Sequence, residues 1–159
     1  MVAAFSVTRW DKPERLDELL AVVHDAFREF EPPSGVLSET LEHLAARFHK
    51  ETFLVAQAGG DIIGSLFCAR KDGALYLTRM AVSPAWRKRG VGRALMAAAE
   101  AEARRIGATR LTLRVRQNLP GNRVYFEHFG FAVTGEGADP GRPPYDAMEL
   151  PLSQKHVIG

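Results

Sequence analysis

The spacing of the apolar residues changes along this chain of 159 residues, and that change limits the fold more than any other feature. Residues 5–9 alternate weakly and predict a strand. Over 13–30, apolar residues recur at three- and four-residue steps and predict an amphipathic helix with one buried stripe. The segment 31–35 ends this helix, because its two prolines supply no backbone N–H. Ser38 can cap a second helix, one face of which carries Leu41, Leu44, Ala45 and Phe48.

From residue 52 the spacing becomes that of strands. Two β-prone runs, 52–57 and 62–69, flank the turn sequence Ala58-Gly59-Gly60-Asp61. A third run, 74–82, follows another turn at 71–73. Together they predict an antiparallel meander of three strands.

The second half of the chain alternates helices and strands. It predicts a long helix at 91–106 with Gly107 as its C-cap, a strand at 111–116, a short helix at 121–129, and last strands at 131–134 and 146–150. The strands on either side of the long helix are expected to run parallel. The predicted fold class is α/β, with one domain over 1–159 and a frayed tail at 153–159. Its central sheet is mixed and mostly antiparallel, with about seven strands flanked by about four helices.

Composition excludes several classes of protein. With 46% hydrophobic and 25% charged residues, the chain has an ordinary globular composition. No apolar run approaches the roughly 18 residues that cross a bilayer, and the N-terminus lacks the features of a signal peptide. We therefore expect a soluble, cytoplasmic protein with no membrane partner. The lone Cys68 cannot form an internal disulfide and is expected to be a buried apolar residue. His43 and His49 fall on opposite sides of their helix, so we expect no metal site.

Charge is distributed unevenly along the chain. Residues 1–60 carry a net charge of −4 and residues 61–159 one of +6, so the second part is expected to meet an anion. Charge alone leaves a small polyanion and a nucleic acid open. The basic residues are spread over strand, loop and helix, without the interleaved aromatic residues of a stacking platform. We therefore expect no nucleic-acid partner.

The most informative segment is 75–95, where an apolar strand runs into a loop and then a helix. Gly90 and Gly92 stand at the start of that helix, so several backbone N–H groups can converge on a ligand with no Cβ in the way. This arrangement predicts a site for phosphate or pyrophosphate. The segment lacks the Gly-Lys-Ser/Thr of a P-loop, and Leu95 breaks the dinucleotide fingerprint. Positive charge is added by Arg87, Lys88, Arg89 and Arg93.

Two motifs resemble those of a known family. Arg87-x-x-Gly90-x-Gly92, after a strand ending in Met80-Ala81-Val82-x-Pro84, resembles the acetyl-CoA-binding signature of the GNAT superfamily of N-acetyltransferases. The run Tyr125-Phe126-Glu127-His128-Phe129-Gly130-Phe131 is similar to that family's short helix, which ends in an aromatic residue, three residues, Gly and Phe. The resemblance covers about 52–131, roughly half of the chain, and the order of elements agrees over the whole length.

The resemblance implies a GNAT fold with acetyl-CoA as co-substrate and no metal. The main chain of Met80, Ala81 and Val82 would pair with the pantetheine arm like an added strand, and the thioester would lie where the strands at Val82 and Val115 part. The N–H of Met80 is the candidate donor to the oxyanion. Backbone amides of the loop would hold the pyrophosphate, at Arg87, Lys88, Arg89, Gly90, Val91, Gly92 and Arg93.

The chain departs from the family at the general acid. In many relatives a tyrosine four residues before the Gly-Phe pair is thought to protonate the departing thiolate. Here that position is Phe126, a candidate cofactor contact, and Tyr125 lies one residue earlier. One residue turns a helical side chain by about 100°, so Tyr125 is either the general acid or a packed or substrate-facing phenol. Asn118 flanks Leu119, where the family often has Asn, and Asn122 either caps the short helix or bonds to the cofactor.

The acceptor side of the site has no motif. Its pocket is expected from the loops at 31–35 and 135–145. Candidates for the general base are Glu29, Glu31 and Glu39, for each of which a solvated surface charge is the plainer interpretation. Trp86 is expected to anchor the loop rather than to cover the cofactor.

The predicted function is transfer of an acetyl group from acetyl-CoA to a primary amine, on a small molecule or on a protein terminus or lysine, by direct attack in a ternary complex. Cys68 is remote from the loop in sequence and gives no support to a covalent enzyme intermediate. A non-catalytic acyl-CoA-binding or sensing domain is the alternative, motivated by Phe126. The identity of the amine, the acyl-chain preference and the formation of a homodimer stay open.

Overall fold

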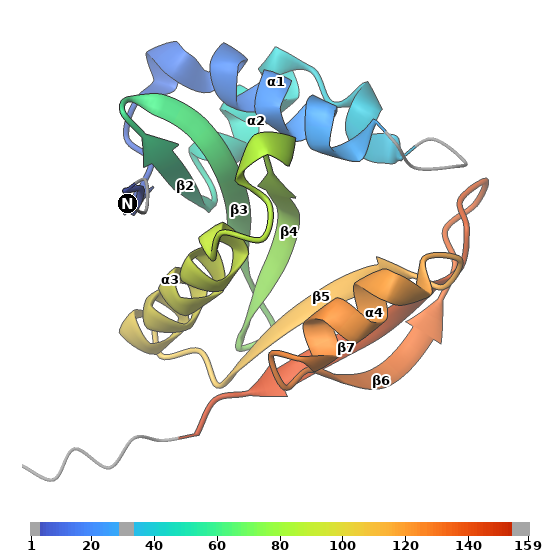
Figure 1. Cartoon of the computed structure of the whole chain (residues 1–159). Coiled ribbons are helices and arrows are strands. Elements are labelled where there is room, and N and C mark those ends of the chain that lie inside the picture. Colours follow the sequence, from blue (N-terminus) through green and yellow to red (C-terminus); the bar gives the residue numbers. More distant parts are fainter. Residues whose placement is uncertain (1–3, 29–33, 154–159) are drawn as a thin grey trace, which may run out of the picture. The chain divides into compact units, whose positions relative to one another are not determined.

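The computed structural model describes residues 4–28 and 34–153 (Figure 1). Its residues group into two compact units. The N-terminal unit takes in Met1–Ala69 and Leu77–Ala101, and the C-terminal unit takes in Arg70–Tyr76 and Glu102–Gly159. The elements are β1 (Ser6–Arg9), α1 (Leu16–Phe27), α2 (Leu41–Phe48), β2 (Thr52–Ala58), β3 (Asp61–Lys71), β4 (Ala74–Val82), α3 (Val91–Arg105), β5 (Arg110–Arg116), α4 (Pro120–Glu127), β6 (Ala132–Gly137) and β7 (Tyr145–Pro151).

The strands form a seven-stranded sheet in the order β1-β2-β3-β4-β5-β7-β6. The pairs β1–β2, β2–β3, β5–β7 and β6–β7 are antiparallel, and β4 and β5 are parallel at Leu75–Leu111 and Tyr76–Thr112. A parallel pair needs a crossover, and α3 supplies it. The predicted α/β class and mixed, mostly antiparallel sheet are therefore confirmed, as are four α-helices within the described residues.

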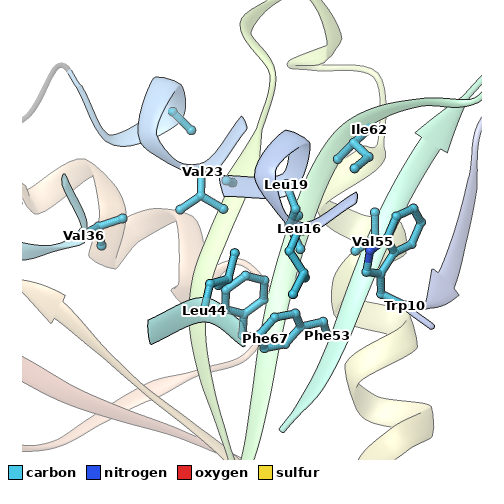
Figure 2. Close-up of a cluster of buried hydrophobic side chains, with 12 residues drawn as sticks. Trp10, Leu16, Leu19, Val23, Val36, Leu44, Phe53, Val55, Ile62 and Phe67 are labelled. Carbon is cyan, nitrogen blue, oxygen red and sulfur yellow. The ribbon is translucent and has the colours of Figure 1, made fainter. Parts of the chain in front are cut away.

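The core of the N-terminal unit lies between α1 and α2 and the sheet (Figure 2). The helical stripe predicted from the spacing is buried, with Leu19 and Val23 fully so. Phe53 of β2 and Phe67 of β3 are direct cross-strand partners and stack at 3.8 Å between ring centroids. Each fully buried side chain of this size stabilises the fold by about 1.5–3 kcal/mol. In Figure 1, α1 and α2 cover one face of β2–β4 and α3 covers the other.

The C-terminal unit buries one face of its strands. Leu111, Leu113 and Val115 alternate along β5 and are buried, as is Met148 of β7. The opposite face of β5 carries Arg114, whose guanidinium lies 5.9 Å from the ring centroid of Tyr76 and 4.4 Å from that of Tyr145. The alternation seen in the sequence is thus that of a strand with one covered face.

Some predicted boundaries are wrong. The first helix is preceded by a 3₁₀ turn, η1 (Pro13–Arg15), and ends at Phe27, while residues 29–33 and 154–159 lie outside the described part of the chain. Ser38 does not cap α2, because it belongs to the 3₁₀ turn η2 (Gly35–Ser38), and Thr40 accepts the bond from the His43 N–H instead. Within the described residues, no helix has the length and apolarity to cross a membrane.

Candidate functional site

The loop between β4 and α3 has a left-handed backbone at Gly90, as a glycine at this position predicts. It begins with the 3₁₀ turn η3 (Pro84–Trp86), and Lys88 and Gly90 then have φ of +62° and +86°. A Cβ added at Gly90 would meet no atom within 4 Å, so the space beside this glycine is open. Helix α3 starts at the next residue, and the first N–H groups of a helix have no partner inside it. The loop therefore fits an anionic group such as a pyrophosphate.

The side chains of the loop are cationic and exposed. Arg87 donates from Nε to the carbonyl oxygen of Val82 at 3.3 Å, which ties the loop to the end of β4. The guanidinium of Arg89 lies 4.8 Å from the ring centroid of Trp86, and Trp86 packs edge-on against Phe5 at 6.2 Å. These contacts anchor the loop at Trp86, as predicted.

The C-terminal part of β4 packs closely against β3. The Ser65 hydroxyl, fully buried, donates to the carbonyl oxygen of Arg79 at 2.8 Å. A Cβ added at Gly64 would stand 2.9 Å from the carbonyl oxygen of Ala81 and 3.1 Å from Cγ1 of Val91 in α3. Only glycine allows this approach, so the start of α3 and the main chain next to Met80 are packed on the same point of β3.

A network of two guanidinium and two carboxylate groups lies beside β4. Arg47 of α2 donates to both oxygens of Glu51 at 2.8 and 2.9 Å and to Glu39 at 3.2 Å. Arg47 also donates to Oγ1 of Thr78 at 2.7 Å, and Arg79 donates from Nε to Glu39 at 3.2 Å. The Glu39 side chain is only 7% exposed, so its interpretation as a solvated surface charge is wrong.

The network keeps Arg47 cationic. Burial by itself lowers the pKa of Arg47, but the hydrogen bond and charge of Glu51, together with those of Glu39, outweigh it, and the net pKa is raised. The guanidinium also lies 5.2 Å from the ring centroid of Phe67. The spacing of Arg47 and Glu51 suits one turn of a helix, but no sequence signal joins them to Arg79.

The remaining candidates lie in the C-terminal unit. Tyr125 of α4 is 42% exposed, and its ring meets Phe126 and Phe129 edge-on at 5.2 and 5.3 Å. Phe126 packs on the buried Phe131 at 5.9 Å. Asn122 does not cap α4, because the helix starts earlier, at Pro120, with Leu119 in the capping position and no side-chain bond there. Asn118 is exposed in the turn before it.

The remaining predictions concern Cys68, metal binding and the acceptor side of the site. Cys68 is buried in β3, as expected. No group of three or more metal-ligating side chains occurs within the described ranges 4–28 and 34–153. Glu29 and Glu31 fall outside them, as does most of the expected acceptor loop at 31–35.

A family model matches most of this chain. The family model described as Acetyltransferase (GNAT) family matches residues 16–131, well over half of the chain. The chain therefore belongs to the GNAT family of acetyltransferases and is an acyltransferase. No curated protein matches the sequence.

Solved structures of low sequence identity share the fold. The PaiA N-acetyltransferase of Thermoplasma acidophilum, in complex with coenzyme A, has a TM-score of 0.80 at 18% identity, covering 94% of this chain and 99% of its own. YncA of Salmonella typhimurium, a putative acetyltransferase with its cofactor acetyl-CoA, has a TM-score of 0.77 at 18% identity, covering 95% of each chain. The ribosomal-protein-S18-alanine N-acetyltransferase of Escherichia coli has a TM-score of 0.71 at 18% identity, covering 98% of this chain and 100% of its own.

Proposed function

We propose that this acetyltransferase moves an acetyl group from acetyl-CoA to a primary amine by direct attack in a ternary complex. The loop after β4 carries the proposal. Its left-handed Lys88 and Gly90 lead straight into α3, and the space beside Gly90 is open. CoA is a polyanion, and a loop of backbone N–H groups at a helix start, surrounded by exposed cations, suits its pyrophosphate.

The binding residues are assigned as the family resemblance implies. The loop from Arg87 to Arg93 would hold the pyrophosphate, and the main chain of Met80, Ala81 and Val82 would bind the amides of the pantetheine arm. In the C-terminal unit, Asn118 and Asn122 would hydrogen-bond the cofactor, and Phe126 would contact it. That Arg87 itself bonds to the carbonyl of Val82 supports a single binding surface for loop and strand.

Acetyl-CoA supplies an activated thioester carbonyl, so the protein has little covalent work to do. The N–H of Met80 would donate to the carbonyl oxygen as negative charge develops on it. Tyr125, which is 42% exposed, would donate a proton to the leaving sulfur and regain one from solvent, into which the attacking amine releases its own proton, whereas Phe126 has no proton to give. Burial of Cys68 speaks against a covalent acyl-enzyme, because a nucleophile must be accessible.

The test uses the purified full chain with acetyl-CoA and a panel of amines. One arm holds small primary amines, and another holds peptides with an N-terminal alanine, because one structural neighbour is an alanine acetyltransferase. We expect release of free CoA thiol and, by mass spectrometry, addition of one acetyl group to an amine of the panel. Calorimetry should detect CoA binding to the chain without an amine. Tight binding of CoA with no acetylated amine would instead favour a sensing domain.

A further inference from the structure

One residue inside strand β4 has a backbone that its side chain disfavours. Arg79 has a φ of +54°, in the left-handed region. Among the described residues, the other two non-glycine residues with positive φ are Asp72 and Lys88, which lie in a turn and a loop. A left-handed residue with a Cβ costs about 1–3 kcal/mol and persists only where its surroundings hold it.

The left-handed step at Arg79 breaks the alternation of side chains along β4. In a regular strand, adjacent side chains point to opposite faces. Here Thr78 and Arg79 are adjacent, yet Thr78 accepts a bond from Arg47 while Arg79 donates to Glu39, which is itself bound to Arg47. Both side chains therefore reach the same network of Arg47 and Glu39, and the left-handed step at Arg79 interrupts the regular alternation of β4 directly before Met80.

The surroundings hold Arg79 from two sides. On the helix side, Glu39 binds its Nε, and the carbonyl oxygen of Glu39 is in turn bound at 3.0 Å by the His24 ring of α1. On the strand side, the buried Ser65 hydroxyl donates to the Arg79 carbonyl oxygen. Arg47 binds Glu39, Glu51 and Thr78, and with Arg79 the network holds two positive and two negative charges, so its charges balance and its polar groups are paired.

We propose that Glu39 and Arg47 are positioning residues, which hold the left-handed Arg79 and thereby direct the backbone groups of Met80, Ala81 and Val82 toward acetyl-CoA. The inference rests on the proposed function for the identity of the ligand. It also assigns Glu39 a role other than general base, because its carboxylate is occupied by two guanidinium groups. The network acts on acetyl-CoA only through β4. Its loss is therefore expected to change the affinity for CoA and the alignment of the thioester.

Two substitutions of Arg79 separate backbone from side chain. Arg79→Gly and Arg79→Val both remove the guanidinium, but glycine adopts positive φ freely, whereas valine opposes it strongly. We expect Arg79→Gly to bind CoA within about threefold of the wild type, and Arg79→Val to lose at least about tenfold in calorimetry. Equal loss in both variants would show that the guanidinium itself matters and would overturn the proposal.

A second pair of variants tests the network. Glu39→Gln is expected to weaken CoA binding about tenfold in the wild-type background and less than about twofold in the Arg79→Gly background, where the left-handed step needs no holding. Glu18→Gln, which breaks the exposed pair with Arg15 in the same unit, is the matched control and should change nothing. Equal losses in the two backgrounds would show that Glu39 is merely structural and would overturn the proposal.

Hydrogen exchange of the ligand-free protein gives a readout that needs neither CoA nor turnover. Over residues 77–83, exchange should be faster by about threefold or more in Glu39→Gln and in Ser65→Ala, and unchanged in Glu18→Gln. Unchanged exchange in the first two variants would overturn the holding role. If the wild type bound no CoA, the proposed function would fail, while this measurement would still decide whether Glu39 holds β4.

Discussion

Two charged regions of the N-terminal unit have opposite physical characters. The loop at 83–93 has four cationic side chains and no carboxylate, and all four cations are exposed. The network beside β4 has two guanidinium groups and two carboxylates, joined by bonds of 2.8–3.3 Å, and its side chains are at most 24% exposed. The loop therefore has a net positive charge that can attract an anionic ligand, whereas the charges of the network balance one another.

Exposed charges and buried, paired charges act differently on the protein and its ligand. Exposed and uncompensated cations raise the local concentration of an anion and release it readily, because water screens them. Buried and paired charges are costly to place, and each fixes its partner in one geometry. We therefore expect changes in the loop to alter affinity and changes in the network to alter stability and alignment.

Arg47→Gln is expected to reduce the stability of the protein strongly. The substitution leaves Glu39 and Glu51 buried without their shared cation, so the free energy of unfolding should fall by about 3 kcal/mol in urea denaturation. Arg28→Gln is the matched control, since its pair with Asp25 is exposed, and its loss should stay below about 0.5 kcal/mol. Similar losses in both variants would remove the distinction between buried and exposed charge.

The next effect is on affinity, from Gly90→Val. The substitution forces a β-branched residue to a φ of +86° and fills the space offered to the pyrophosphate, so the KM for acetyl-CoA should rise about 100-fold. Gly60→Val is the matched control, because Gly60 has a φ of +91°, also with nothing within 4 Å, but lies in the turn between β2 and β3. Its stability should fall similarly with no change in KM. An unaltered KM in Gly90→Val would refute the assignment of the loop.

The third prediction concerns the rate of catalysis and two neighbouring aromatic residues of the C-terminal unit. Tyr125 is exposed, whereas Phe126 packs on Phe131. If the phenol returns the proton to sulfur, Tyr125→Phe should lower kcat about tenfold and leave the dissociation constant of CoA unchanged. Tyr76→Phe is the matched control, because it removes a phenol of β4 whose ring centroid lies 5.9 Å from the Arg114 guanidinium and which has no assigned role, and it should keep its kcat. A full rate in Tyr125→Phe would leave the phenol no part in proton transfer.

The sequence predicts those parts of the molecule that depend on local patterns. Helix α1 and strands β2–β5 follow from apolar spacing, and the turns at Gly59-Gly60 and after Arg105 follow from glycine. The left-handed backbone of the loop at 87–93 is predictable in the same way, because its cations and glycines stand within seven residues. Local signals fail at helix starts: Ser38 and Thr40 are both good caps, and only the preceding 3₁₀ turn decides between them.

The network could not be predicted, because its members are distant in sequence. Glu39 and Arg79 are 40 residues apart and meet only when α2 packs on β4. An isolated glutamate near a helix start is ordinarily a surface charge, and only the fold shows that this one is buried. The left-handed Arg79 has no sequence signal either, since arginine does not mark positive φ as glycine and asparagine do.

Removing one cation of the loop, in Arg89→Gln, is expected to weaken CoA binding only slightly. Arg89 is exposed and lies on Trp86, so it contributes to the general field of the loop, and the dissociation constant of CoA should rise about threefold at low salt. At 1 M salt, where the Debye length is about 3 Å, the difference from the wild type should vanish. Lys50→Gln, another exposed cation of this unit, should bind CoA as the wild type does. A loss above about tenfold that persisted in salt would show a desolvated contact at Arg89, and the loop would then resemble the network in how its charges act.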